Sequence, residues 1–498
     1  MKKLSLRGIA TIEILIAFTF MVIILSGAVL LAFGGQTSGL DVELANHGLY
    51  RVLSQNESNI AAAAGSWGSL VNSSVSAGGY TTSLDVMSIS ACMKFATTSI
   101  SWASENNRIG NSSLVSLFAN ITEARALGGS CSPLPPPQWE NPDTFASETV
   151  SAIRANDVAV GSIDGKRIAV LVSTAGAGAE SKHDIWVFDL SDIQNPSLLT
   201  STSTGVGLNA VALSGLYAYA VQNDSTEQLQ VIKLIDTAKA VTDPLRWNAR
   251  LVDSVNLKNV GGVYPEGRSI AFYDNRLYVG TWNNNVPVNS PEFLIYDVSS
   301  PDSLVFLGSY NLGHSVNAIA VSSAYAYLAT TNNAGELTIM NVSDPGSPTV
   351  ASTFHFLGSS KDAESIALVG TTAYLGLTKA TASGDLDFLA INVSNPFSPT
   401  LYMGGPSGLK LNMNGAGAAA TNIVIQGPYA FVGTSDTNDE FRVLLISNPA
   451  KPVPQGCPPY NYSAKVSGLA YVDGLVVASN STNDSLRVIY DAPGTQCH

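Results

Sequence analysis

Basic residues are scarce in this chain. Its 498 residues include 25 Lys and Arg against 38 Asp and Glu, which gives a formal net charge of −13. The imbalance is concentrated in residues 144–498, which hold 29 acidic and 18 basic residues. Because a surface that binds nucleic acid must attract phosphate groups, this composition argues against nucleic acid as a partner of that part of the chain.

Cysteine is scarcer still, and linear catalytic and metal motifs are missing. The four cysteines form no C-x-x-C pair, which argues against a zinc or dithiol redox motif. The sequence has no HExxH, no GxSxG and no P-loop. Three acidic loops, at 384–387, 436–440 and 480–484, lack calcium-loop spacing and are expected to be solvated hairpin loops. We therefore expect no metal, no cofactor and no enzymatic activity.

A hydrophobic run long enough to cross a bilayer begins at Ile9. It ends at Phe33 and would extend about 37 Å as a helix. Three basic residues precede it and none follows until Arg51, so the positive-inside rule places residue 1 in the cytoplasm and the rest of the chain outside. Glu13 lies near the start of the run. An ionisable group in the hydrocarbon layer costs a few kcal/mol, so an acid at this position indicates a function.

These residues closely resemble the cleavage and methylation segment of type IV pilins and pseudopilins. A short basic leader ends in Gly8, and Glu13 is the fifth residue after it. The resemblance implies that prepilin peptidase cuts after Gly8 and that the new amino terminus, Ile9, is N-methylated, although the family prefers Phe there. It also implies that Glu13 pairs with the amino terminus of a neighbouring pilin subunit. A plain signal anchor is the alternative.

Residues 34–132 are expected to form a pilin-like head. Apolar residues at helical spacing from Leu40 onward predict a long spine helix, and 80–89 and 93–102 predict two strands. Residues 114–127 predict a helical or mixed segment. A spine helix with a small antiparallel sheet is the plan of pilin heads, so the expected class of this part is α+β.

A proline-rich stretch at 133–143 separates this head from the rest of the chain. Its three consecutive prolines predict an extended, fairly stiff linker. The cysteines fall two on each side of it, and an exported location permits disulfides. Three pairings are open; local pairing of Cys92 with Cys131 and of Cys457 with Cys497 is expected because each pair lies within one predicted domain. Free buried thiols are the alternative.

From residue 144 onward, one pattern recurs seven times. An apolar strand, a turn, a second strand rich in Tyr, Ala and Val, a loop and a third apolar strand are followed by a Ser/Asn/Asp-Pro turn. The residues at the first turn of each copy are Gly165, Gly215, Asn275, Ser323, Gly370, Gly427 and Gly474. A period near 50 residues with about four strands per unit predicts a β-propeller.

The units resemble LVIVD repeats, a family of propeller repeats in prokaryotic surface proteins. LTIMNVSDPGSP from Leu337 and FLAINVSNPFSP from Phe388 carry the resemblance. We expect seven blades over 144–498, with six or eight as alternatives, and a pair of β-sandwiches as the alternative architecture. The last unit lacks an outer strand, which residues 145–154 are expected to supply, closing the ring.

The predicted organisation is therefore a leader (1–8), a transmembrane or filament-core helix (9–33), a pilin-like head, a linker and a propeller. The expected function is that of a minor pilin-like subunit of a type IV pilus-type filament, with the propeller as an adhesive or partner-binding head for a surface protein or glycan. The subunit would wait in the inner membrane before display at the cell surface. A pseudopilin of a type II secretion-like system and a membrane-anchored exported enzyme are the alternatives. A cluster of titratable groups with shifted pKa values at the propeller axis would favour the enzyme.

Overall fold

A computed structural model of the chain describes residues 73–119, Trp139 and residues 142–491, with gaps. The residues left out between these limits are 78–79, 91–92, 104–108, 149–153, 175–182, 206, 223–226, 258–264, 283–289, 357–360, 379–386, 403–407, 410–417, 437–438, 456–464 and 481–484. The predicted processing and assembly residues Gly8, Ile9 and Glu13 lie outside the described residues, as do the spine helix and the four cysteines. The part of the chain that is described contains no helix long and apolar enough to cross a membrane.

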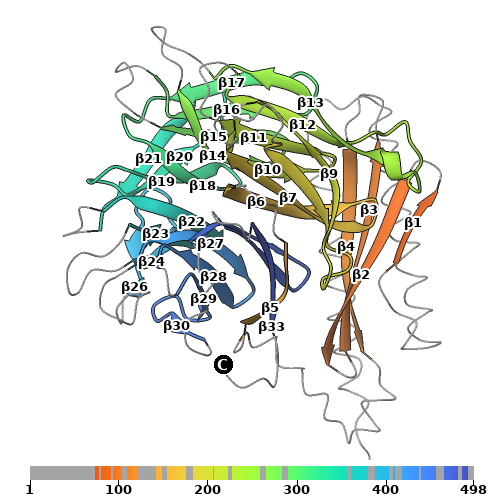
Figure 1. The fold of residues 1–498 in the computed structure, drawn as a ribbon. Coiled ribbons are helices and arrows are strands. Elements are labelled where there is room, and N and C mark those ends of the chain that lie inside the picture. The colour runs from red at the N-terminus through yellow and green to blue at the C-terminus, as the bar shows by residue number, and fades with distance from the viewer. Residues whose placement is uncertain are drawn as a thin grey trace, which may run out of the picture. The chain divides into compact units, whose positions relative to one another are not determined.

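The chain divides into two compact units, Met1–Leu134 and Pro135–His498. The described part of the first unit is a four-stranded antiparallel sheet in chain order (Figure 1). Its strands are β1 (Ser73–Ala77), β2 (Tyr80–Ser90), β3 (Met93–Ala103) and β4 (Ile109–Ala119). The strands predicted at 80–89 and 93–102 are thus confirmed as β2 and β3.

The helical or mixed segment predicted at 114–127 is wrong for residues 114–119. These residues belong to β4, which pairs with β3 along its whole length, from Met93 opposite Ala119 to Ala103 opposite Ile109. A short apolar run such as Leu-Val-Ser-Leu-Phe has no decisive periodicity, so the eleven-residue ladder to β3 determines its conformation.

In its described residues, the second unit forms seven antiparallel sheets, each the blade of a propeller. Blade 1 contains β6 (Arg154–Ile163), β7 (Lys166–Thr174), β8 (Ile185–Asp189) and β9 (Ser197–Thr202). Blade 2 contains β10 (Leu208–Ser214), β11 (Tyr217–Gln222), β12 (Leu229–Ile235) and β13 (Trp247–Val255). Blade 3 contains β14 (Glu266–Tyr273), β15 (Arg276–Trp282), β16 (Phe293–Asp297) and β17 (Val305–Tyr310).

The later blades repeat this order. Blade 4 contains β18 (Val316–Ser322), β19 (Tyr325–Thr330), β20 (Leu337–Asn341) and β21 (Thr349–Phe354). Blade 5 contains β22 (Ala363–Val369), β23 (Thr372–Leu377), β24 (Phe388–Asn392), β25 (Thr400–Leu401) and β26 (Gly408–Leu409). Blade 6 contains β27 (Ala420–Gln426), β28 (Tyr429–Thr434), β29 (Phe441–Leu445) and β30 (Val453–Pro454). Blade 7 contains β31 (Val466–Val472), β32 (Leu475–Asn480), β33 (Leu486–Asp491) and β5 (Pro142–Glu148).

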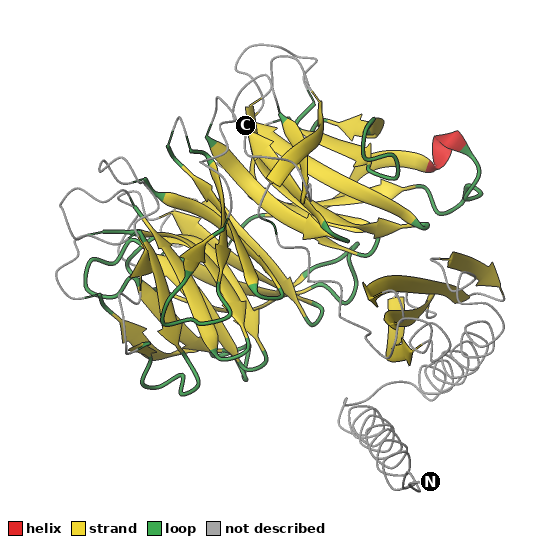
Figure 2. Cartoon of the chain, turned by 90° about the horizontal axis from the view of Figure 1, so that it is seen from below, coloured by secondary structure: helices red, strands yellow, loops and turns green. Residues whose placement is uncertain are grey.

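The first strand of each blade lies at the centre of the ring and contacts the first strand of the next blade (Figure 1). β31 of blade 7 contacts β6 of blade 1, so the ring is closed. The predicted seven-bladed propeller is confirmed, and the sandwich alternative is wrong. Among the described residues, the strands and loops are interrupted by one short 3-10 helix, η2 (Pro244–Arg246) (Figure 2).

The predicted turn residues explain why each blade begins with a tight hairpin. All seven have a positive φ, between 53° at Ser323 and 84° at Gly474. Five are glycine, which adopts this conformation without steric cost, and Asn275 is among the next most tolerant residue types. The hairpin turns therefore fix the repeat, as the sequence predicts.

Ring closure uses the strand that precedes blade 1. β5 pairs with β33 from Pro142 opposite Asp491 to Glu148 opposite Leu486. The closing strand predicted at 145–154 therefore exists, but it begins and ends earlier, and Arg154 already starts β6. Trp139, inside the proline-rich stretch, is buried and packs edge-on against Phe431, 4.6 Å between ring centroids.

The core lies between the blades. The second and third strands are buried on both faces, as in β11 (YAYAVQ) and β12 (LQVIKLI), because each blade is covered by a neighbour on each side. One apolar cluster joins blades 1 and 2, and another joins blades 7 and 1. This packing places the inner strands side by side around the axis.

Candidate binding site in the central channel

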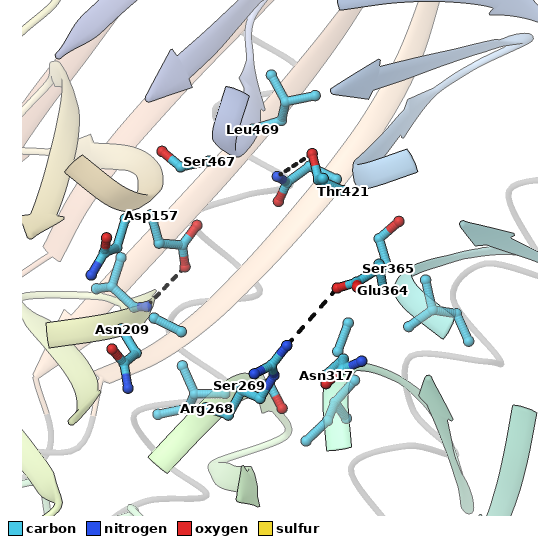
Figure 3. Close-up of a pocket in the computed structure, with 18 of the residues that line it drawn as sticks. Asp157, Asn209, Arg268, Ser269, Asn317, Glu364, Ser365, Thr421, Ser467 and Leu469 are labelled. Carbon is cyan, nitrogen blue, oxygen red and sulfur yellow. Dashed lines mark hydrogen bonds and ion pairs between the residues drawn. The ribbon is translucent and has the colours of Figure 1, made fainter. Parts of the chain in front are cut away.

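A cavity of about 560 Å³ lies at the centre of the ring (Figure 3). Its lining comes from the inner strand of each blade and from the segment just before β31. These residues are Asn156–Val158, Asn209–Val211, Arg268–Ile270, Asn317–Ile319, Glu364–Ile366, Thr421–Ile423, Lys465, Ser467 and Leu469, with Trp282 from β15. The volume falls within the range of roughly 300–1,000 Å³ that is typical of ligand pockets.

A β-bulge at one equivalent position shapes the channel wall. In the described inner strands, the register to the second strand shifts across a single residue near the start of each strand. The skipped residues are Asn156, Asn209, Arg268, Asn317, Glu364, Thr421 and Ser467. A bulge redirects the side chain of its extra residue, and here that residue is polar in each blade.

In five blades the bulged side chain donates a hydrogen bond to the next blade. The acceptor is the main-chain carbonyl immediately before the next bulge. The bonds are Asn156 to Leu208 (2.7 Å), Asn209 to Gly267 (2.7 Å), Asn317 to Ala363 (2.6 Å), Thr421 to Val466 (3.1 Å) and Ser467 to Ala155 (2.5 Å). Each such bond is worth about 1 kcal/mol, and together they tie neighbouring blades at the axis.

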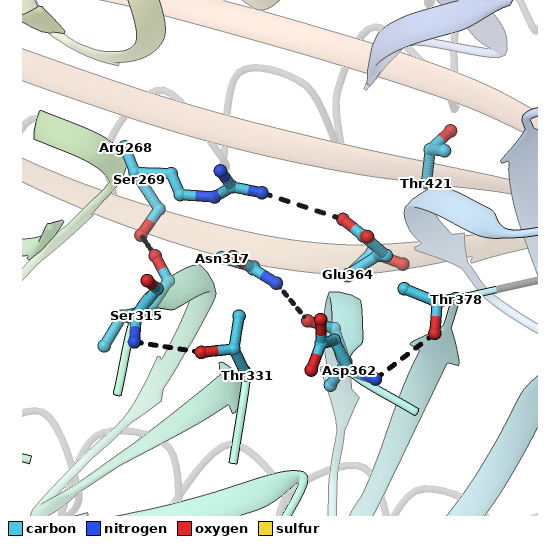
Figure 4. A network of polar contacts seen from close by, with 12 residues as sticks. Arg268, Ser269, Ser315, Asn317, Thr331, Asp362, Glu364, Thr378 and Thr421 are labelled. Carbon is cyan, nitrogen blue, oxygen red and sulfur yellow. Dashed lines mark hydrogen bonds and ion pairs between the residues drawn. The ribbon is translucent and has the colours of Figure 1, made fainter. Parts of the chain in front are cut away.

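Blades 3 and 5 differ, because their bulged residues are the charged Arg268 and Glu364. In these blades the following serine makes the inter-blade bond, as Figure 4 shows for Ser269 of blade 3. The Ser269 hydroxyl donates to the Val316 carbonyl at 2.9 Å, and the Ser365 hydroxyl donates to the Ala420 carbonyl at 2.7 Å. The circle of bonds is complete, and the two charged side chains do not carry the inter-blade bond.

Glycines opposite these serines give the hydroxyls room. Gly280 faces Ser269 and Gly376 faces Ser365 across the first two strands of their blades. A Cβ atom at Gly280 would lie 2.2 Å from Ser269 Oγ, and one at Gly376 would lie 2.3 Å from Ser365 Oγ. In blade 4, which has no serine here, alanine faces alanine.

Arg268 and Glu364 point toward one another in the channel (Figures 3 and 4). Arg268 Nη2 lies 3.9 Å from Glu364 Oε2, and both side chains are about a quarter exposed. The Arg268 guanidinium lies over the Trp282 ring, 4.1 Å from its centroid. Burial lowers the pKa of Arg268 from its usual value, and the charges of Glu364, Asp362 and Glu266 oppose that shift.

Asp157 lies in the wall of the same channel. Its carboxylate accepts main-chain hydrogen bonds from Val158 at 2.8 Å and from Val211 of blade 2 at 3.0 Å. Burial raises the pKa of Asp157 to about 7, against the lowering effect of these two bonds. Gly468 of blade 7 makes space for it, since a Cβ there would lie 2.6 Å from Asp157 Oδ1.

The prediction that the acidic loops are solvated is wrong for Asp387, Asp439 and Glu440, while residues 384–386, 437–438 and 481–484 lie outside the described residues. Asp387 is buried and pairs with the buried Lys361 at 3.1 Å, while Asp439 pairs with Arg442 and Glu440 is buried. An acid just before the third strand recurs in other blades, where it accepts hydrogen bonds from the connection to the next blade. Glu292, for example, binds the amides of Leu312 and Gly313. The described residues contain no group of three or more possible metal ligands of the His, Cys, Asp and Glu types.

The channel residues were not identified from the sequence. The first strands of the repeats are evident in the sequence, for instance VNAIAV from Val316 and ESIAL from Glu364, and an alignment of them places their opening polar residues at one position. That alignment carries a signal, because Arg and Glu replace the Asn, Thr or Ser of other copies. Trp282 lies at the end of a second strand, and no sequence signal connects it to the axis.

Residues 313–355 and 417–456 match the LVIVD repeat family. The chain contains LVIVD repeats. The matches cover all the described strands of blade 4 and of blade 6. No curated protein matches the chain.

Two solved structures are similar to the chain at low sequence identity. BamB from Moraxella catarrhalis is 14% identical with a TM-score of 0.40, and the WD40 β-propeller domain of Doa1 is 14% identical with a TM-score of 0.44. Each alignment covers 72% of this chain and 100% of the other chain. Similarity at this level does not bear on function.

Proposed function

We propose that this chain is a minor subunit of a type IV pilus-type filament that displays its LVIVD-repeat propeller as a partner-binding head. The channel carries the proposal for the head: two charged side chains stand in a polar cavity, while serines beside them hold the blades together. A ring whose bulged residues only held the blades together would not need charged residues at two of its bulges. The sequence of residues 1–33 supports the filament part of the proposal.

The proposed processing and assembly of the subunit follow from its first residues. Prepilin peptidase cuts after Gly8, Ile9 becomes the methylated amino terminus, and Glu13 pairs with a neighbouring subunit. The chain passes once through the inner membrane before assembly, and the propeller is then displayed outside the cell. Its acidic composition disfavours nucleic acid as the partner, so a surface protein or glycan is the expected class.

Removal of the propeller tests this function. The deletion should begin at Pro135, because Trp139 and β5 belong to the second unit and a later cut would leave them behind. Filaments should still form, while attachment of cells to surfaces or partner cells should be lost. Attachment that equals that of the intact strain would overturn the proposal for the head.

An exported enzyme is a second candidate, favoured by the raised pKa of Asp157 in the channel. A carboxyl group that titrates near neutral pH can act as a general acid or base. The two main-chain bonds of Asp157 give it a structural task as well. A hydrolase screen of the full chain, compared with Asp157→Asn, separates the two: turnover that disappears in the variant favours the enzyme.

A pseudopilin of a secretion system is the remaining alternative for the filament. A pilus subunit and a pseudopilin would both be cut after Gly8, and they differ in what the filament does. Loss of secreted hydrolases from the medium after deletion of the chain, with attachment unchanged, would favour the pseudopilin.

A further inference from the structure

We infer that the channel binds an uncharged glycan and that Arg268 and Glu364 hold neighbouring hydroxyl groups of one sugar unit. This inference rests on the proposed function, since it names the ligand class of the same head. The first observation behind it is that Arg268 and Glu364 do not make the inter-blade hydrogen bonds of blades 3 and 5, because Ser269 and Ser365 make them instead.

The separation of the pair leaves hydrogen-bonding capacity unused between its charged groups. The 3.9 Å between Arg268 Nη2 and Glu364 Oε2 exceeds the 2.7–3.2 Å range of an N–H···O hydrogen bond. A guanidinium only donates and a carboxylate only accepts. A hydroxyl group does both, so adjacent hydroxyls can accept from Arg268 and donate to Glu364 at once.

The balance of charge favours a ligand without net charge. Arg268 and Lys465 bring two positive charges to the lining. Glu364 brings a carboxylate, and Asp157 brings a carboxyl group that is partly ionised at neutral pH because burial raises its pKa to about 7. An anion would be attracted by Arg268 and Lys465 and repelled by the carboxyl groups, and a cation would experience the reverse. A neutral ligand with paired donors and acceptors gains from both kinds of group.

The surroundings of the pair suit a sugar ring. Trp282 is 39% exposed beside Arg268 and offers an aromatic surface with a polar N–H. Amide and hydroxyl side chains of Asn317 and Thr421 stand on the inner strands of blades 4 and 6, on the two sides of Glu364 (Figure 4). The site therefore combines an aromatic face, an Arg–Glu pair and further polar groups within one cavity.

The test compares the full-length chain with R268N/E364N, kept in a detergent without a sugar headgroup. Asn occupies the bulge in blades 1, 2 and 4, and Ser269 and Ser365 still supply the inter-blade bonds, so this variant should fold normally. The probes are a panel of neutral trisaccharides and, separately, a panel of tripeptides. We expect at least one trisaccharide to bind the intact chain and its affinity to fall at least tenfold in the variant, with an unchanged melting temperature.

The matched control is K239N/D243N, which removes an ion pair of the same 3.9 Å separation outside the channel. Its affinity for the trisaccharide should equal that of the intact chain. The inference is overturned if no trisaccharide binds, if R268N/E364N binds as well as the control, or if tripeptides bind and trisaccharides do not. Cell attachment that persists in R268N/E364N but is lost on removal of the propeller would overturn this inference and leave the proposed function intact.

Discussion

Ser269 and Ser365 make the hydrogen bond to the next blade that the preceding bulged residue makes in other blades. In most blades the bulged side chain itself binds the next blade, which restricts it to Asn, Thr or Ser. Where the serine one position further along the strand makes this inter-blade bond, the bulged residue can be of another type. Blades 3 and 5 can therefore carry charges at the axis without losing their link to blades 4 and 6.

Gly376→Ala should destabilise the propeller. The new Cβ would lie 2.3 Å from Ser365 Oγ and 2.4 Å from the Ala420 carbonyl oxygen, so the inter-blade bond or the backbone must shift. We expect a loss of about 1–3 kcal/mol in unfolding free energy, measured by denaturant titration. The double variant Gly376→Ala/Ser365→Ala reproduces the Ala318–Ala329 pair of blade 4 and should recover part of the loss. Additive effects of the two substitutions would contradict the proposed clash.

Asp157 should make stability depend on pH in the neutral range. Its folded-state pKa of about 7 lies above the ordinary value of 3.8, so the folded chain binds the proton more tightly than the unfolded chain. The stabilisation is complete below about pH 4 and is lost as pH rises through 7. Since the side chain is partly exposed in the channel, the effect should amount to roughly 1–2 kcal/mol.

The measurement is the melting temperature of the intact chain and of Asp157→Asn between pH 5 and pH 8. The intact chain should lose stability across this interval relative to the variant. Parallel curves for the two proteins would show that Asp157 does not titrate there.

Single strands and turns were more predictable than the residues at the axis. The hairpin positions Asn275 and Ser323 were found because turn chemistry depends on a few local residues. The bulges were not predictable. A strand such as VNAIAVS has an apolar pattern that fits a regular strand and a bulged one equally well, so the sequence does not reveal the shift of one residue. The strand β4 was missed for a related reason: its pairing with β3, not its own sequence, determines its conformation.

Proline within β5 should weaken the closure of the ring. Replacing Ala146 and Ser147, which lie opposite Val488 and Arg487, with proline removes a backbone donor from the ladder with β33, because one of two successive amides of an edge strand points toward its partner strand. We expect a loss of about 1–3 kcal/mol, the cost of a carbonyl left without its donor, and early proteolysis within blade 7. Val453→Pro in β30, a two-residue outer strand that already contains Pro454, is the control and should be tolerated. Equal resistance of both variants to protease would argue against closure by β5.

The molecule as a whole consists of two compact units. The propeller could be predicted from its period and turns, because repetition multiplies a weak local signal seven times. The axial site could not, because it exists only where residues from distant blades meet. The processing residues remain predictions, and their test concerns the whole chain.

Mass spectrometry of the mature chain should find Ile9 at its amino terminus. Glu13→Ala should reduce its content in purified filaments several-fold, because the buried amino terminus of a neighbour would lose its counter-charge. Propeller folding, followed by melting temperature, should be unaffected. An intact Met1 in assembled filaments, or normal incorporation of the variant, would refute the pilin assignment.

The pairing of β5 with β33 also has a consequence for the order of folding. The paired residues are at least 338 positions apart, from Glu148 to Leu486. During synthesis, β5 therefore emerges before blade 1 and keeps an unpaired hydrogen-bonding edge until the last blade has formed. A chain that stops early cannot cover this edge, so incomplete propellers remain recognisable to chaperones and proteases as unfinished.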